Sequence, residues 1–342
     1  MTRETCASAA PATPVYKEVI AYIKNSPISL ADDDILEKRH LLNNPPSADN
    51  LPEVAPLETK VIPTSAENGT GTVTITLVRP KGTENDTLPL AIYLHGGGWF
   101  LGSFKVSEKF IKDVVVHAHI AVAYVEYTLS PDVKYPVALE ECYSSTLWLH
   151  ENASSINVDP SKITIFGDSA GGNLSAAVTL LLKQRGHGSL LKSQILLYPA
   201  TAHDRDDYDS YHAYGNGGYI LTIPELTVMA SFYHEEQYKL ADGRNPGPKS
   251  ALNAPLLATD DELKDLPPCL TITAECDLLR DEGEHYTRRL TDAGVETCTV
   301  RVIGAVHGFF TLAPISTPGD PSTETTPQYR QSLGLIANYL KA

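Results

Sequence analysis

The amino-acid sequence predicts an α/β protein with an open, mostly parallel sheet and helices on both of its faces. Short apolar or β-branched segments alternate along the chain with segments of helical periodicity, which is typical of strand–helix–strand units. One predicted strand joins a predicted helix through a Gly-x-Ser-x-Gly turn. A serine, an aspartate and a histidine each follow a predicted strand, where the active groups of parallel sheets lie.

Residues 1–50 precede every predicted strand. Apolar residues at helical spacing predict a helix over Val15–Lys24, and Ser29 suits the N-cap of a second helix that reaches Leu42. Asn43–Pro56 is rich in proline and asparagine and is predicted to be a linker. Two helices and a linker indicate a segment that lies across a later domain. A simple N-terminal extension is the alternative.

The rest of the chain alternates between strands and helices. The predicted strands are Thr72–Val78, Leu88–Leu94, Ala121–Thr128, Lys162–Phe166, Ser193–Tyr198, Cys269–Cys276 and Cys298–Ile303. The predicted helices are Tyr135–Asn152, Leu174–Leu182, Asp281–Ala293 and Tyr329–Leu340. Residues 51–200 and 260–342 are therefore assigned to one α/β domain. Residues 201–259 are assigned to an insert, because long insertions in compact domains are usually lids or binding segments.

The Gly-x-Ser-x-Gly turn spans Gly167–Gly171 and is the most informative stretch of the chain. A buried strand, a sharp turn and a buried helix in this order are the context of a nucleophile elbow. The turn is too tight for large flanking side chains, and it presents the Ser169 hydroxyl above the sheet edge. A chance Gly/Ser turn is the alternative, which the flanking strand and helix disfavour.

A serine hydroxyl is a weak nucleophile at neutral pH, so it needs a base within hydrogen-bond reach. His307 follows the strand Cys298–Ile303 and is the candidate base. An acid must orient the imidazole and stabilise its charged form, and Asp277, at the first turn beyond a strand, is the candidate. The alternatives are Asp281 or Glu282 as the acid and His95 as the base.

A second glycine-rich stretch, His95–Trp99, follows the strand Leu88–Leu94. Its three glycines leave backbone N–H groups without side-chain cover, so an anionic oxygen can approach them. This position suits one half of an oxyanion hole. A flexible turn is the alternative reading of the glycines alone.

The insert contains acidic, histidine and tyrosine side chains. They are His203, Asp204, Asp206, Asp207, Tyr208, Tyr211, Tyr214 and Tyr219. A metal site is one interpretation, and a solvated, tyrosine-rich loop over a cleft is the favoured one. We predict neither a metal nor a cofactor.

Composition limits the classes of partner. A formal net charge of -15 argues against nucleic acid and anionic membranes. No apolar run approaches the ~18 residues that a membrane span needs, and the first residues lack a signal-peptide pattern. The cysteines are odd in number and lack metal-ligand spacing, which suits a reducing, cytoplasmic location. They are Cys6, Cys142, Cys269, Cys276 and Cys298.

Together these motifs resemble those of the hormone-sensitive-lipase family of α/β-hydrolase esterases. The resemblance covers the chain from about Val73 onward. The matching stretches are His95–Trp99, Tyr127–Pro131 with Tyr135-Pro136, Gly167–Gly172, Asp277–Gly283 and His307–Phe309. Three positions depart from it. Thr128 and Ser130 stand where many members carry Arg and Ala, and Leu278 stands where Pro is more usual.

The resemblance implies a carboxylesterase with an eight-stranded sheet and a helical cap, made from the N-terminal helices and the insert. It implies that Ser169 attacks a short- to medium-chain acyl ester, that His307 transfers the proton and that Asp277 orients the imidazole. It also implies an oxyanion hole from the N–H groups of Gly97, Gly98 and Ala170, with Gly96 as a further loop donor. Homodimers are common in the family.

Two other functions stay open at this point. An amidase or deacetylase would use the same triad. A non-catalytic receptor is also known on this fold, in the plant gibberellin receptors, which resemble the family but lack the base histidine. His307 within a matching motif argues against a receptor.

Overall fold

The computed structural model describes residues 12, 14, 16, 17, 20, 21, 35–45, 51–64, 69–311 and 326–342. The predicted helix Val15–Lys24 and residues 29–34 of the next lie largely or wholly outside these residues. The described part of the second helix is α2 (Ile35–Leu42). Residues 46–50 of the predicted linker also lie outside the described ranges.

The sheet confirms the predicted fold class. It has eight strands in the order β1-β2-β4-β3-β5-β6-β7-β8. Their bounds are β1 (Glu58–Pro63), β2 (Thr72–Val78), β3 (Leu88–Leu94), β4 (Ala121–Glu126), β5 (Val158–Asp168), β6 (Ser193–Leu197), β7 (Cys269–Cys276) and β8 (Thr297–Val306). Strand β2 is antiparallel to β1 and β4, and the other neighbours are parallel. The ends of β5, β7 and β8 therefore meet at one edge.

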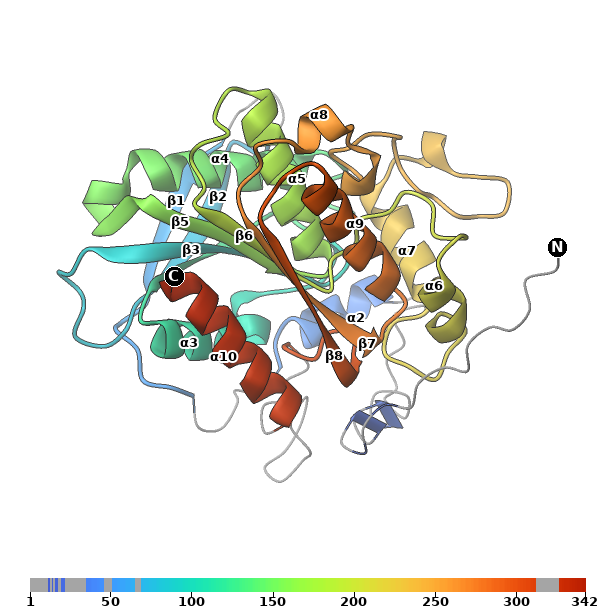
Figure 1. Ribbon diagram of the computed structural model, residues 1–342, viewed down its shortest axis with the longest axis horizontal. Helices are drawn as coiled ribbons and strands as arrows, with labels where there is room; N and C mark the ends of the chain where they lie inside the picture. The colour runs from blue at the N-terminus through green and yellow to red at the C-terminus, as the bar shows by residue number, and fades with distance from the viewer. Residues whose placement is uncertain are drawn as a thin grey trace.

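Helices cover both faces of this sheet, as Figure 1 shows. On one face lie α3 (Phe104–Ala118) and α10 (Pro327–Lys341), which contact each other. On the other lie α4 (Val137–Glu151), α5 (Ala170–Gln184) and α9 (Arg280–Asp292). Strands buried on both faces are expected to be continuously apolar, and β3 is buried at every position except Pro89.

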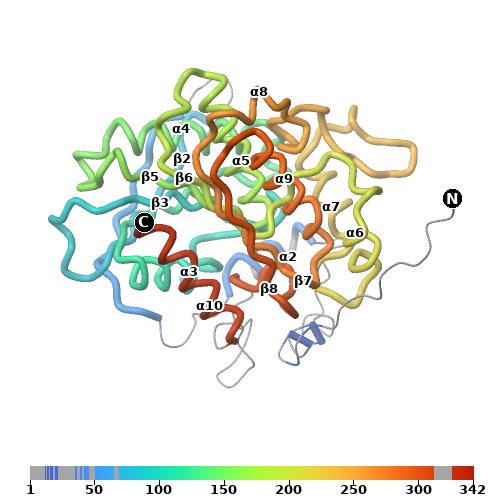
Figure 2. The backbone as a smooth tube through the Cα atoms, in the orientation of Figure 1, coloured from blue at the N-terminus to red at the C-terminus, as the bar shows by residue number. Residues whose placement is uncertain are grey.

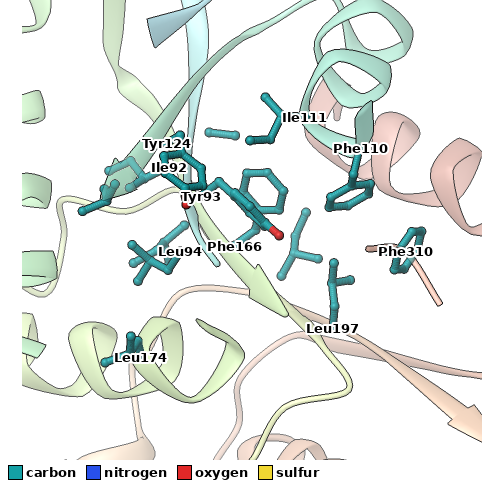
Figure 3. Close-up of a cluster of buried hydrophobic side chains, with 14 of the residues drawn as sticks. Ile92, Tyr93, Leu94, Phe110, Ile111, Tyr124, Phe166, Leu174, Leu197 and Phe310 are labelled. Atoms are coloured by element: carbon teal, nitrogen blue, oxygen red, sulfur yellow. The ribbon is translucent and has the colours of Figure 1, made fainter. Parts of the chain in front are cut away.

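Aromatic rings fill the space between β3, β5 and α3. The rings of Tyr93 and Phe166 lie 4.8 Å apart between centroids, and Tyr93 also meets Phe110 edge-on at 5.9 Å. Figure 3 shows these side chains with their aliphatic neighbours. Offset and edge-on ring pairs add stability beyond the area that they bury. This cluster lies directly beneath the strands that lead to His95 and Ser169.

The insert is more ordered than the solvated loop predicted for it. It contains α6 (Asp209–Tyr214) and α7 (Ile223–Tyr233), with short turns at Glu236–Tyr238 and Pro255–Leu257, and α8 (Asp260–Leu263) follows it. Figure 2 shows α6 and α7 together on one side of the molecule. Tyr211 and Tyr214 are buried, not solvated, because they pack into the main core. No helix in the described ranges is long and apolar enough to cross a membrane.

Candidate active site

Ser169 lies between the end of β5 and the start of α5 with φ 55° and ψ −117°. Such a backbone conformation is strained for a residue with a Cβ, and it is the expected geometry of a nucleophile elbow. The two glycines of the turn are sterically required. A Cβ on Gly167 would lie 2.5 Å from the Leu94 carbonyl oxygen, and one on Gly171 would lie 2.6 Å from the His95 oxygen.

Hydrogen bonds connect Ser169, His307 and Asp277 in one chain. The Ser169 Oγ lies 2.9 Å from His307 Nε2, and His307 Nδ1 lies 2.7 Å from Asp277 Oδ2. A carboxylate only accepts, so Nδ1–H donates to Asp277 and Nε2 is left to accept the serine proton. Asp277 follows β7 directly and His307 follows β8, so the sheet order brings both beside the end of β5.

Burial and charge act in opposite directions on His307. Burial is the largest single influence and lowers the pKa of the imidazole, but the surrounding carboxylates, Asp277 foremost, together outweigh burial, and the net pKa is raised above the ordinary histidine value. The Asp277 side chain is fully buried and its Oδ1 accepts a hydrogen bond from Leu279 N at 2.9 Å. This arrangement favours a base that becomes charged readily.

The two alternative acids point elsewhere. Asp281 pairs with Arg280 at 2.7 Å and accepts a hydrogen bond from the backbone of Ser210 at 2.8 Å. Glu282 accepts hydrogen bonds from the N–H groups of Thr201 and Ala202 at 2.6 and 3.0 Å. Both side chains therefore bind the insert.

His95, the alternative base, supports the glycine loop. Its ring is stacked on Tyr127 with centroids 4.1 Å apart, and its Nδ1 lies 2.7 Å from the Gly96 carbonyl oxygen. Burial lowers the pKa of this imidazole to about 4. A neutral Nδ1–H therefore donates to Gly96.

The glycine loop follows β3 and faces Ser169. No hydrogen bond from the N–H groups of Gly97, Gly98 or Ala170 is found in the described part of the chain. Gly96 differs from the expectation for it. Its N–H donates to Asp168 Oδ1 at 2.8 Å, so it is not a spare donor for an oxyanion. The Asp168 carboxylate already accepts this hydrogen bond, so the same N–H group cannot also bind a ligand oxygen.

A cavity of about 170 Å³ opens above Ser169 and His307. Beyond the Ser169 and His307 side chains, most of the cavity wall is aliphatic. This part consists of Leu101, Ile220, Leu221, Leu226, Met229 and Leu279. Four of these come from α7 or the segment before it. A Cβ on Gly98 would lie 2.6 Å from Met229 Cγ, so α7 packs directly on the glycine loop.

The His/Asp cluster of the insert forms ion pairs and backbone contacts. Asp206 pairs with Arg244 at 2.9 Å, and His203 Nε2 lies 3.3 Å from the Gly247 carbonyl oxygen. No group of three or more His, Cys, Asp or Glu side chains within the described ranges is arranged to hold a metal ion.

Sequence reasoning missed two residues beside the site, Asp168 and Met229. Asp168 occupies the variable position of the Gly-x-Ser-x-Gly turn, and a charged residue at the end of a buried strand is the signal that could have identified it. Met229 lies in a segment that the sequence analysis does not assign to a helix. The capping pair Thr222 and Glu225 at the start of α7 was the available signal.

Comparisons with known proteins identify the family of the chain. The sequence pattern of the alpha/beta hydrolase fold family matches residues 91–311. An arylesterase of Saccharolobus solfataricus is 35% identical over 221 residues, which are 64% of this chain and 68% of that protein. The carboxylesterase NlhH of Mycobacterium tuberculosis is 33% identical over 228 residues, which are 67% of this chain and 68% of that protein.

A solved structure extends the similarity to nearly the whole chain. A fungal esterase from Rhizomucor miehei is 40% identical, and the match covers 97% of each chain with a TM-score of 0.81. As the motifs predict, the chain belongs to the alpha/beta hydrolase fold family, and it is a carboxylic ester hydrolase.

Proposed function

We propose that the protein hydrolyses carboxylic esters through a Ser169–His307–Asp277 triad and an acyl-enzyme. The observation that supports this proposal most directly is the unbroken hydrogen-bond chain from the Ser169 hydroxyl through His307 to the Asp277 carboxylate. Ser169 Oγ attacks the acyl carbon while His307 Nε2 takes its proton. The imidazolium then protonates the leaving alcohol, and water repeats the sequence to release the acid.

The developing oxyanion needs donors that are already in place. We assign this role to the N–H groups of Gly97, Gly98 and Ala170. Their positions beside Ser169 in the cavity wall support the assignment. Gly96 is left out of the hole because Asp168 occupies its N–H.

The decisive test replaces Ser169 with alanine. Ser169→Ala is expected to reduce kcat for p-nitrophenyl butyrate to a trace, because only the oxyanion hole and substrate binding survive. The matched control is Ser175→Ala on α5, where the lost hydroxyl donates only to a carbonyl of its own helix. A Ser169→Ala enzyme with more than about a tenth of the wild-type kcat would contradict the triad. An inactive wild-type protein would restore the receptor alternative.

The aliphatic wall supports acyl groups of short to medium length as substrates. A cavity of about 170 Å³ accepts a short chain, and α7 supplies part of the wall that a longer chain would meet. A series of p-nitrophenyl esters from acetate to palmitate measures this. We expect kcat/KM to rise with each early methylene and then to fall sharply. A profile that rises to the longest esters would contradict the proposal.

We further propose that residues 1–50 and 201–259 form a cap over residues 51–200 and 260–342. The N-terminal side is fastened beside the glycine loop. Asn43 Oδ1 accepts a hydrogen bond from Gly102 N at 2.9 Å, and the Asn43 carbonyl accepts one from Ser103 Oγ at 2.6 Å. Arg39 donates to the Ser130 carbonyl at 3.0 Å. A segment held in this way restrains the approach to the cavity.

Deletion of residues 1–45 tests the cap. The deletion removes no strand that the structure describes, so circular dichroism should still report an α/β fold. It should raise KM for the preferred ester and flatten the chain-length profile, since Gly102 and Ser103, just beyond the glycine loop, lose their hydrogen bonds with Asn43. Arg39→Ala in the full chain is the milder variant, with a smaller change in the same direction. An unchanged profile from a folded truncation would leave the insert as the sole cap.

A further inference from the structure

The carboxylate of Asp168 contacts three parts of the active site at once. Its Oδ1 accepts hydrogen bonds from the Tyr93 hydroxyl at 2.6 Å and from Gly96 N–H at 2.8 Å. Its Oδ2 lies 3.5 Å from the Thr311 hydroxyl, which follows the turn after His307. The residue is only 3% exposed and it immediately precedes the nucleophile. One side chain therefore joins β3, the glycine loop and the histidine loop.

These contacts fix the position of the glycine loop. A Cβ on Gly96 would lie 2.8 Å from the Asp168 carbonyl oxygen, and it would also clash with the Asp168 carboxylate. Gly96 N–H can only donate, so Oδ1 must accept. Because charge-assisted bonds are about twice as strong as neutral ones, an ionised Asp168 holds Gly97 and Gly98 more firmly than a neutral group would.

The same carboxylate also acts on the charge of His307. The imidazole becomes positive during the proposed reaction, and nearby negative charge favours that form. Three acidic side chains raise the pKa of His307 in this way: Asp277 beyond β7, Asp168 at the end of β5 and Glu225 on α7. A further titratable neighbour among the described residues is Tyr198, whose ring centroid lies 5.0 Å from that of His307. Burial raises the pKa of its phenol, so it remains neutral.

Four buried tyrosines, Tyr93, Tyr124, Tyr127 and Tyr198, lie within electrostatic reach of Asp168, and burial raises the pKa of each phenol well above its ordinary value. Burial likewise raises the pKa of Asp168, while the bonds from Tyr93 and Gly96 favour its charged form. A charge in surroundings of such low polarity acts on its neighbours more strongly than it would in water.

We propose that Asp168 is a positioning residue of the catalytic machinery, which anchors the Gly96–Gly98 backbone and supplies a second negative charge that stabilises protonated His307. This inference rests on the proposed triad. It assigns to Asp168 two separable effects, one mechanical and one electrostatic. A purely structural role would predict only the first.

The two effects are separated by two variants of nearly unchanged shape. Asp168→Asn keeps an oxygen that accepts from Tyr93 and Gly96 but removes the charge. It should lower kcat roughly tenfold. It should also move the acid limb of the kcat/KM profile to lower pH, because protonated His307 loses a stabilising neighbour. Tyr93→Phe removes one anchoring bond and keeps the charge. It should lower kcat roughly threefold to tenfold with the acid limb in place.

Kinetics of p-nitrophenyl butyrate from pH 5 to 9 give both readouts, with circular dichroism to confirm folding. If Asp168→Asn does not fold, Asp168→Thr removes the charge with a small side chain that suits a strand end. Wild-type kcat with an unmoved acid limb in the charge-removing variant would overturn the inference, as would an equal shift in Tyr93→Phe. Neither result would contradict the proposed function, because the wild-type enzyme would still hydrolyse the ester. Failure of the proposed function would instead appear as full activity in Ser169→Ala.

Discussion

The indole ring of Trp99 and the phenol ring of Tyr233 are stacked in parallel, with centroids 4.4 Å apart and 1° between their planes. Trp99 ends the glycine loop, and Tyr233 is the last residue of α7. The Tyr233 carbonyl also accepts a hydrogen bond from Tyr135 N at 2.8 Å. The insert and the glycine loop are thus packed against each other. Substitutions on α7 should therefore change the kinetics of the active site.

Met229→Ala should shift the preferred ester to a longer acyl chain. The side chain lies against Gly98 and forms part of the cavity wall, so its removal creates room for further methylenes. Each methylene that is newly buried is worth about 0.8 kcal/mol, or roughly fourfold in kcat/KM. A p-nitrophenyl ester series measures the shift. Thr227→Ala on the same helix is the control, because its hydroxyl bonds only within α7. Identical profiles for the two variants would remove Met229 from the acyl site.

Asp277→Asn should reduce kcat on the order of 10⁴-fold, since the amide cannot stabilise the imidazolium or hold its tautomer. Asp281→Asn should cost far less, because Asp281 faces Arg280 and the backbone of Ser210. Purified variants assayed at pH 8 make the comparison. A reversed order of the two losses would show that Asp281 is the orienting acid.

The activity should fall as the pH decreases through the pKa of His307. Neutral imidazole accepts the serine proton, and protonation removes this base. Burial lowers the pKa of His307, yet the nearby carboxylates, Asp277 foremost, together outweigh burial and the net shift of the pKa is upward. The acid limb of kcat/KM is therefore expected to have its midpoint above about pH 6.5, the ordinary histidine value. A midpoint well below that value would contradict the electrostatic account.

Arg205→Ala should destabilise the fold where the insert meets α9. Arg205 Nε lies 2.7 Å from Glu282 Oε2 in an ion pair whose angle does not suit a hydrogen bond, and Nη2 donates to Oε1 at 3.3 Å. Removal of one partner from a buried pair typically costs about 3–5 kcal/mol. Urea unfolding measures the loss. Lys264→Ala removes an exposed pair with Asp261 and should leave the midpoint unchanged. Equal midpoints for both variants would show that the buried pair contributes nothing.

The strands of the sheet interior and the motif residues could be predicted because their signals are local. Strands β2, β3 and β7 have the predicted bounds, because each is a short run rich in apolar or β-branched residues, alternating with Thr in β2 and nearly continuous in β3. The places of Ser169, Asp277 and His307 after strands follow from the same reading. The hydrogen bonds that join them had to come from the structure.

Strand β1 and helix α3 escaped sequence reasoning for physical reasons. Strand β1 is at the sheet edge, and Ile62 is its only buried residue, so no alternation marks it. Helix α3 contains three consecutive valines, Val114 to Val116, which favour strand conformation locally. The capping of its first turn by Ser103 and the burial of Phe110 with Val114 make it a helix. The contact between Asp168 and Gly96 joins residues 72 positions apart, which no local pattern encodes.

Ser169 and His307 are 138 positions apart in the chain, and His307 and Asp277 are 30 apart. Their hydrogen bonds form only when β5, β6, β7 and β8 are paired in this order and in the native register. A refolding intermediate with native helices but an incompletely paired sheet would show no activity in an esterase assay. Return of turnover after dilution from denaturant therefore times the assembly of the sheet centre, whereas far-ultraviolet ellipticity times the helices. Any lag between the two signals measures the interval from collapse to register.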